Sequence, residues 1–352
     1  MTASTKSHGM DGTLVEPDWP PLTAAELSFV PGAVITWHSP RPMSAAALVA
    51  SGGSTVFVKR HHRLVRDGSQ LAAEHAFGAY LRAAGQPVPA VLGVYQQGEF
   101  WYEVFGLVDG VDGYRDAVSW SPYLFPEHAA AAGAALARLH LAAAGFPGAE
   151  RPFGPLMSSS SLVTAADPLS ALDALMASRP GFARFPSLRS DFAQYVLPLI
   201  VRAGPVLRSL APQWGHGDWH PSNLTWTSRS AAAEVAGVFD LGLANRTSAV
   251  HDLAVALERS VFSWLDMPGA RFDAAMARAL LAGYSSVRPL SAAERAALPL
   301  VLPVAHVEYA LSEISYFADV VHSVANAGLA YDYLIDHARF FITNGGSCPG
   351  IV

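Results

Sequence analysis

The sequence predicts an α+β protein of two lobes, in which a small antiparallel sheet with one key helix precedes a larger, mainly helical lobe. Short apolar runs separated by turn residues occupy the first third of the chain, and helical periodicity dominates the remainder. The length of 352 residues is about twice that of a usual single domain. We therefore expect a flexible, Pro-rich arm at 1–25 and lobes at 26–108 and 109–352.

The first lobe is expected to contain one helix among five strands. The helix has Asp67 or Ser69 as its N-cap and ends before Gly85 and Pro87, which is the usual asymmetry of caps. Apolar runs bounded by turn residues predict the strands. They lie at 33–37, 44–51, 54–60, 91–96 and 99–108.

The second lobe follows a Gly/Asp-rich connector at 109–116. An Ala-rich helix at 127–144 opens it, and a later helix is interrupted by Pro198 and Pro205. Two short strand-like pieces follow, one at 213–217 leading to 223–227 and the other at 235–244, and each carries polar residues at a strand end. After them the chain is expected to be helical to the tail.

Charge and composition exclude several classes of protein. The net charge is −6 and no basic stripe is present, so nucleic acid is not expected as a partner. No stretch reaches the ~18 uninterrupted apolar residues of a membrane span. The one cysteine, Cys348, permits no intrachain disulfide, which favours a reducing cytoplasm. The sequence does not fix an oligomeric state.

One lysine stands out in a chain that uses arginine for almost all positive charge. Of 23 basic residues only Lys6 and Lys59 are lysine. Glu74 falls on the apolar stripe of the first-lobe helix, where a buried carboxylate needs a cation. Lys59, on a strand of the same sheet, is the available partner. The pair would hold an ammonium near phosphate oxygens, or else it is a structural ion pair, or Glu74 reaches solvent.

A second polar cluster combines a tight loop with the end of a strand. The loop reads HGDWHPSN from His216 to Asn223, and the later strand ends in VFDLG around Asp240. Asp218 and Asn223 are five residues apart around a Pro-containing turn and can converge on one point. One would accept a proton from a hydroxyl, while the other and Asp240 supply the oxygen ligands that Mg²⁺ prefers.

These motifs resemble those of the aminoglycoside phosphotransferase and choline kinase superfamily, relatives of the protein kinases. With Lys59 and Glu74 upstream, the match runs in family order from about residue 30 to 317. The resemblance implies a protein-kinase-like fold, with ATP and Mg²⁺ as cofactors. It implies transfer of the γ-phosphate to a hydroxyl of a small molecule such as an amino alcohol, hydroxy amino acid, aminoglycoside or sugar. The segment from Leu280 resembles the homoserine-kinase-like branch and hints at a hydroxylated amine or amino acid.

The resemblance also assigns roles to single residues. Asp218 resembles the catalytic base, Asn223 and Asp240 the Mg²⁺ ligands, Lys59 the contact to the α- and β-phosphates, Glu74 its helix partner, His216 and His220 framework residues, and Asp252 a buried brace of the loop. The acceptor would lie near the C-terminal helices. Glu308, Glu313 and Asp319 offer negative charge there, unless they form only a solvated face.

The first strand turn departs from the protein-kinase pattern because it contains no glycine. It reads HSPRPMS from His38 to Ser44, where Ser39 and Ser44 are candidate phosphate-binding residues. Backbone amides and these two hydroxyls can cradle phosphate, although Pro40 and Pro42 remove two N–H donors.

Two other functions remain open from the sequence. His216, Asp218 and His220 alternate in a way that suits a transition metal, which would suggest a hydrolase. That interpretation leaves Lys59, Glu74 and Asp240 without a role. The second is a catalytically silent relative that binds nucleotide or a partner protein, because a fold does not dictate its function. Consumption of ATP separates it from a kinase.

Overall fold

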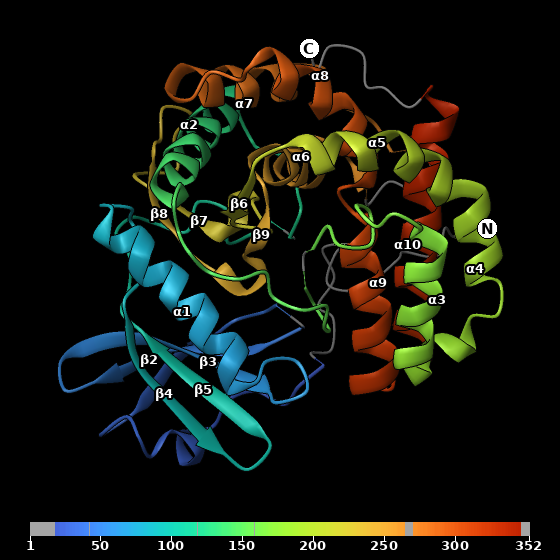
Figure 1. The fold of residues 1–352 in the computed structure, drawn as a ribbon. Helices are drawn as coiled ribbons and strands as arrows, with labels where there is room; N and C mark the ends of the chain where they lie inside the picture. Colours follow the sequence, from blue (N-terminus) through green and yellow to red (C-terminus); the bar gives the residue numbers. More distant parts are fainter. Residues whose placement is uncertain (1–17, 42, 118, 158, 265–269, 346–352) are drawn as a thin grey trace, which may run out of the picture.

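The computed structural model describes residues 18–41, 43–117, 119–157, 159–264 and 270–345. A five-stranded antiparallel sheet with helix α1 across it forms one lobe, and helices form most of the other (Figure 1). This is the two-lobed α+β architecture expected from the sequence. Residues 1–17 of the expected arm and Cys348 lie outside the described residues.

The first lobe is built on a sheet whose strand order is β1-β2-β3-β5-β4. Its strands are β1 (Val34–His38), β2 (Ala45–Ser51), β3 (Ser54–His62), β4 (Val91–Gln97) and β5 (Phe100–Phe105). Val49 and Val58 of the central strands are fully buried and pack with Leu27 from the segment before β1. Lys59 of β3 lies between Ala46 of β2 and Glu103 of β5 in the register.

Helix α1 (Gly68–Ala83) forms where its cap and its apolar stripe predict it. The side chain of Asp67 accepts hydrogen bonds from the backbone N–H groups of Ser69 and Gln70, so Asp67 rather than Ser69 is the N-cap. The inward face buries the predicted stripe, Glu74 included. The helix therefore brings a carboxylate into the interior beside the second lobe.

The second lobe holds nine α-helices among the described residues. They are α2 (Pro126–Ala143), α3 (Pro168–Ser178), α4 (Leu188–Asp191), α5 (Leu197–Ser209), α6 (Ala249–Ser260), α7 (Ala274–Val287), α8 (Ala292–Val301), α9 (Val307–Ser315) and α10 (Val324–Thr343). A π-helical turn at Phe192–Val196 separates α4 from α5, and Pro205 lies inside α5. The sequence reasoning named neither α3 nor the separate α10.

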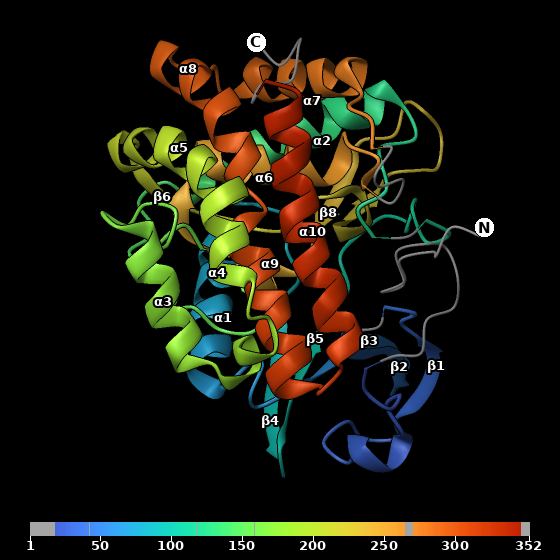
Figure 2. The same ribbon diagram turned by 90° about the vertical axis from the view of Figure 1, so that its right-hand side faces the viewer.

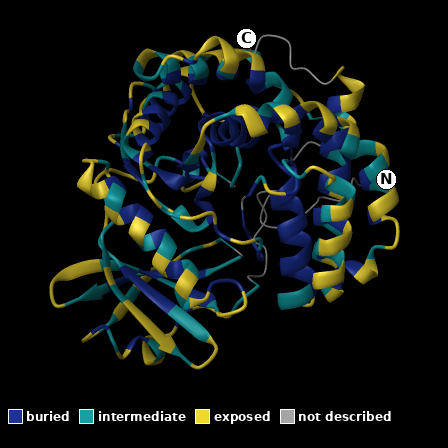
Figure 3. Ribbon diagram, viewed as in Figure 1, coloured by how far each residue is buried: buried dark blue, intermediate teal, exposed yellow. Residues whose placement is uncertain are grey.

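Two small antiparallel sheets lie between the helices and carry the polar motifs. One pairs β6 (Pro212–Gly215) with β9 (Asn245–Ser248), and the other pairs β7 (Leu224–Trp226) with β8 (Val235–Val238). Helix α6 lies at the centre of the lobe with every residue buried (Figure 3). The helices α9 and α10 run side by side at the edge of the lobe (Figures 1 and 2).

Helices α2 and α7 approach closely because each has a glycine at the crossing. A Cβ atom on Gly133 would lie 2.0 Å from the backbone oxygen of Leu280, and one on Gly283 would lie 1.9 Å from that of Ala130. Any side chain there would force the helices apart. This approach also brings Tyr284 of α7 to His140 of α2.

The described part of the expected arm packs against both lobes. Trp19 Nε1 donates to the hydroxyl of Tyr316 in the second lobe at 2.9 Å, and its ring stacks on His62 of β3. Leu22 is buried, and its carbonyl lies 2.9 Å from His38 Nε2. Residues 18–22 thus connect the sheet to the helical lobe.

One described stretch, Ala292–Val320, is long and apolar enough to cross a membrane by length and composition alone. In the structure 89% of its most apolar window is buried. This is how a core helix of a folded lobe behaves, so the stretch is weak support for a membrane span.

Candidate active site

A buried carboxylate fixes the loop His216–Asn223, which connects β6 to β7. Asp252 of α6 accepts the backbone N–H groups of His216 at 2.8 Å and Gly217 at 2.7 Å. The side chain of Asp252 also accepts a 2.9 Å hydrogen bond from Nε2 of His140. The other ring nitrogen of His140, Nδ1, lies 2.7 Å from the hydroxyl of Tyr284. Burial alone would raise the pKa of Asp252, but the hydrogen bond and charge of His140 lower it below its ordinary value.

The two histidines of the loop are hydrogen-bonded to the loop and its neighbouring strand. His216 Nε2 donates to the carbonyl of Phe239 at 3.0 Å, and its Nδ1 accepts the backbone N–H of Asp218 at 3.2 Å. His220 Nδ1 lies 3.0 Å from the hydroxyl of Ser222. Burial, with a smaller contribution from the charge of Arg41, lowers the pKa of His220 to about 3. Both contacts are those of framework residues, as the resemblance implied.

Asp218 lies at the centre of the loop and is held from two sides. Its Oδ2 accepts a 3.0 Å hydrogen bond from Asn223 Nδ2, which also donates to the Asp218 carbonyl at 2.9 Å. Its Oδ1 forms an ion pair with Arg259 at the end of α6. The Arg259 guanidinium is buried between the rings of Trp120 and Tyr309, at 4.7 and 4.4 Å from their centroids. The candidate base is thus positioned by its predicted neighbour and by an arginine.

Asp240 follows β8 and meets the lysine that the composition singled out. Lys59 Nζ lies 2.8 Å from Asp240 Oδ1, so an ion pair joins the two lobes. Asp240 adopts the left-handed backbone conformation with a φ of 59°, which costs energy in a residue other than glycine and is typical of functional turns. Burial would raise the pKa of this carboxyl, but the charge and hydrogen bond of Lys59 hold it well below its usual range.

Glu74 does not pair with Lys59, so the expected partner was wrong. Its carboxylate binds two buried arginines instead, Arg66 through Nε at 2.9 Å and Arg151 through Nη2. Both guanidinium groups also donate to the carbonyl of Gly242, at 2.8 and 2.9 Å. Planar guanidinium groups make several fixed hydrogen bonds at once, which an ammonium cannot do. Glu74 therefore anchors the Asp240 turn to α1, and it is buried rather than directed to solvent.

The turn between β1 and β2 contains the two candidate phosphate-binding serines. Ser39 donates its backbone N–H to Ala46 at 2.8 Å, and its hydroxyl accepts the backbone N–H of Arg41 at 3.3 Å. Ser44 immediately precedes β2, and Pro42 lies outside the described residues. A contact of either hydroxyl with phosphate stays a prediction.

Of the three acidic residues expected near the acceptor, Glu308 and Glu313 are buried and Asp319 is partly buried, so they do not form a solvated face. Glu308 accepts the backbone N–H groups of Leu162 at 2.8 Å and Val163 at 3.0 Å. Asp319 accepts the N–H of Gly181 at 2.7 Å. Glu313 differs, because burial raises its pKa to about 8 against the opposing charge of Arg259. Two of the three carboxylates therefore hold backbone segments, and Glu313 lies beside the arginine that holds Asp218.

Comparison with known proteins identifies the family. The model of the phosphotransferase enzyme family matches residues 44–290. This chain belongs to that family. Within it, a homoserine kinase of Gluconacetobacter diazotrophicus is 35% identical over 199 residues, which cover 55% of this chain and 54% of that protein. The chain spans about half the length of the first curated relatives it matches.

Solved structures share the fold of this phosphotransferase-family chain. An ethanolamine kinase of Plasmodium vivax superposes with a TM-score of 0.59 at 10% identity, covering 92% of this chain and 86% of that one. An aminoglycoside-3'-phosphotransferase of type VIII gives a TM-score of 0.53 at 20% identity, covering 84% and 98%. The kinase-like, two-lobed fold implied by the resemblance is confirmed.

Sequence reasoning missed the arginines of the site. Arg259 lies in the predicted helix after the Asp240 turn, and Arg66 lies directly before the N-cap of α1. Arg151 follows α2 in a segment without regular structure. The available signal was an arginine soon after an apolar helical run, where an arginine is seldom buried without a partner. That signal applies to Arg259 alone.

Proposed function

We propose that this chain transfers the γ-phosphoryl group of ATP to a hydroxyl of a small molecule. The observation that carries the proposal is the 2.8 Å contact of Lys59 with Asp240 across the lobes, beside the hydrogen-bonded pair of Asp218 and Asn223. Membership of a phosphotransferase family supports it. Because phosphoryl transfer needs positioning and charge stabilisation more than covalent chemistry, these four side chains suffice for its main parts.

The donor set suits a magnesium ion. Asn223 uses its Nδ2 group on Asp218, which leaves Oδ1 as the atom able to bind a cation. The Asp240 side chain is 37% exposed and can exchange its contact with Lys59 for a metal contact. Carboxylate and amide oxygens are the ligands Mg²⁺ prefers. Bound there with ATP, the ion would offset negative charge on the phosphates.

The chain's own residues would position the acceptor and the phosphates. Asp218 accepts a hydrogen bond from the acceptor hydroxyl and takes its proton as the new O–P bond forms, while the bond from the γ-phosphorus to the bridging oxygen breaks and ADP leaves. Arg259 and Asn223 keep that carboxylate in one orientation. Lys59 places its charge on the phosphate oxygens of the leaving nucleotide.

For the acceptor we propose a small hydroxylated amine or hydroxy amino acid. The curated relatives called homoserine kinases support this class, although they match over about half their length. Glu313, Tyr309 and Arg259 form a buried polar group next to Asp218, and such a group can recognise an amine or a carboxylate. We place the reaction in the cytoplasm, where ATP is available.

The test is a search for product with a matched inactive variant. Protein with Mg²⁺ and ATP is offered homoserine, amino alcohols, aminoglycosides and sugars, and phosphorylated products are detected by mass spectrometry. Asp218→Asn should lower turnover by on the order of 10²–10⁴ while ATP still binds. Asp173→Asn, which alters an exposed carboxylate paired with Arg189, is the control and should keep full turnover.

The other outcomes favour the alternatives. Binding of ATP without consumption across the panel would favour a catalytically silent relative, and unchanged turnover in Asp218→Asn would reject the assigned base. The hydrolase is disfavoured, because both ring nitrogens of His216 are already engaged, one by the backbone of Asp218 and the other by the carbonyl of Phe239. Among the described residues, His216, Asp218 and His220 do not form a group of three metal ligands.

A further inference from the structure

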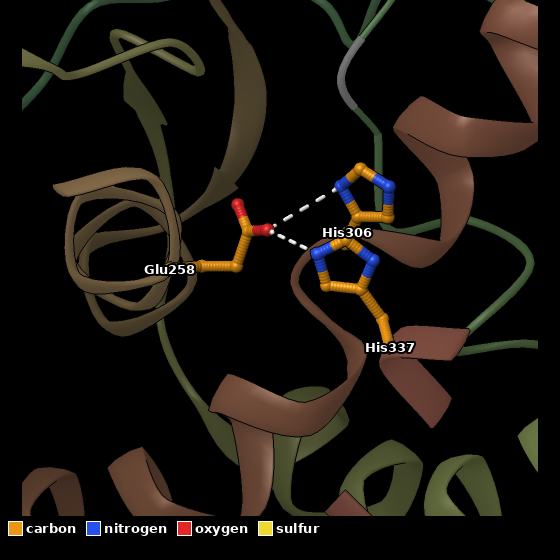
Figure 4. A group of neighbouring side chains, drawn as sticks. All are labelled: Glu258, His306 and His337. Atoms are coloured by element: carbon orange, nitrogen blue, oxygen red, sulfur yellow. Dashed lines mark ion pairs between the residues drawn. The ribbon is translucent and has the colours of Figure 1, made fainter. Parts of the chain in front are cut away.

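Three buried side chains from three helical segments of the second lobe point toward one another. Glu258 lies near the end of α6, His306 directly precedes α9, and His337 lies in α10 (Figure 4). One ligand atom from each lies within 4.8 Å of the others, and all three residues are at least nine-tenths buried. None of the three has a role in the proposed phosphoryl transfer.

The hydrogen bond of His337 fixes which of its nitrogens faces the carboxylate. His337 Nδ1 lies 2.6 Å from the carbonyl of Tyr333, and a carbonyl only accepts, so Nδ1 carries the hydrogen. In neutral imidazole the lone pair is then on Nε2, which lies 3.2 Å from Glu258 Oε1. A lone pair facing a carboxylate repels it unless a proton or a metal cation lies between them, and a metal cation would satisfy both groups at once. A carbonyl that orients the ring in this way is the usual outer partner of a metal-binding histidine.

His306 adds a second imidazole with unused hydrogen-bonding capacity. Neither of its ring nitrogens has a hydrogen-bond partner among the described residues, and its Nδ1 lies 3.5 Å from Glu258 Oε1. The rings of His306 and His337 stack with centroids 4.1 Å apart. Burying a polar group without a partner costs free energy. The Nδ1 of His306 therefore needs a ligand that the fold does not supply.

We propose that Glu258, His306 and His337 bind one divalent transition-metal ion. A tetrahedral ion with bonds of about 2.0–2.1 Å separates its ligand atoms by about 3.3 Å. The two separations from Glu258 Oε1, 3.5 and 3.2 Å, match that geometry. Two imidazoles and one carboxylate suit zinc and its neighbours in the first transition row rather than magnesium or calcium.

The proposed ion is separate from the magnesium of the candidate active site, which has other ligands. One of its proposed ligands, Glu258, is nevertheless the neighbour in sequence of Arg259, the arginine of α6 that pairs with the candidate base. The second oxygen of Glu258 lies 3.9 Å from Arg259 Nε, and Arg259 pairs with Asp218. An ion that ties α6, α9 and α10 together would therefore also fix the helix end that positions the candidate base.

The first test measures zinc in the full chain, purified without a histidine tag. After dialysis against zinc chloride and then metal-free buffer, elemental analysis should find about one zinc per chain. The double variant His306→Gln with His337→Gln should lower the zinc affinity by on the order of a hundredfold or more. The matched control is His128→Gln, since His128 is a buried histidine whose nitrogens contact Tyr114 and Ser230 instead. It should keep the zinc.

Zinc-free wild-type protein, or equal zinc in the double variant and wild type, would overturn the proposal. A second measurement serves if the double variant does not fold. The Trp264 ring lies 3.8 Å from that of His337, so Co²⁺ at the site should quench Trp264 fluorescence and saturate at one equivalent. Trp264→Phe should remove most of the quenching, because of the tryptophan rings that the structure describes only that of Trp120, 6.3 Å from the ring of His306, then lies close to the ion, while Co²⁺ still shows the visible absorption of a tetrahedral ion. Quenching unchanged by Trp264→Phe, or no Co²⁺ absorption, would equally reject the site.

Discussion

Two ion-paired carboxylates flank the turn that carries Gly242, and they are held in opposite ways. Among the residues that the structure describes, Asp240 has one ion-pair partner, Lys59, and its side chain is 37% exposed. Glu74 is 7% exposed and is held by Arg66 and Arg151 together. A single exposed contact can be exchanged for another ligand at little cost, whereas a buried group with two partners cannot. The difference separates the carboxylate that we propose binds the metal from the one that holds the turn.

The largest expected effect is on catalysis through Asp240. Asp240→Asn removes the charge that would bind the metal, so turnover of the identified acceptor should fall by on the order of 10³. The free energy of unfolding should change by less than about 1 kcal/mol, because the contact with Lys59 is partly exposed. Steady-state kinetics and urea denaturation measure the two effects. Turnover within tenfold of wild type would place the metal elsewhere.

The second effect is on stability through Glu74. Glu74→Gln leaves Arg66 and Arg151 buried without their countercharge, so the free energy of unfolding should fall by about 3–5 kcal/mol. Asp173→Asn breaks the exposed pair with Arg189 and should cost less than about 1 kcal/mol. Urea denaturation compares the two variants. Equal costs would mean that the buried triad contributes no more than a surface pair, which would remove the contrast with Asp240.

The sequence predicted those features that depend on neighbours along the chain. The five strands, the cap at Asp67 and the inward stripe of α1 all follow from local patterns, and the structure has them. The loop from His216 to Asn223 also predicted its own internal contact, since Asn223 reaches Asp218 five residues away. The rarity of lysine drew attention to Lys59, which the structure pairs with Asp240, and its contact with phosphate stays a prediction.

The sequence could not predict partners chosen by tertiary packing. Glu74 and Arg151 are 77 positions apart, and Asp218 and Arg259 are 41 apart. No periodicity relates such residues, and several cations compete for each buried carboxylate. Lys59 was therefore assigned to Glu74 because both lie in the first lobe, whereas the packing of α1 on the second lobe brings Arg151 closer.

A third carboxylate sharpens the comparison, because its partners are histidines. Glu103 is buried in β5 with His61 Nε2 at 2.8 Å and His75 on its other oxygen. Burial alone would raise its pKa, but the hydrogen bonds of the two histidines lower it from 4.5 to about 2. Between these values the unfolded chain binds more protons than the folded one, so stability rises with pH. The contribution of Glu103 is present above pH 4.5 and is lost as the pH falls toward about 2.

The smallest expected effect is the loss of this slope in Glu103→Gln. In that pH window wild-type stability should fall more steeply than that of the variant, by at most about 1.4 kcal/mol per pH unit. Urea midpoints at several pH values measure it. Glu99→Gln is the matched control, because Glu99 precedes the same strand, is 56% exposed and pairs with Arg63. Its profile should follow the wild type. Parallel profiles for wild type and Glu103→Gln would mean that the two histidines do not hold Glu103 ionised. Of the three carboxylates compared, only Asp240 and Glu74, whose partners are lysine and arginine, would then be held by a cation.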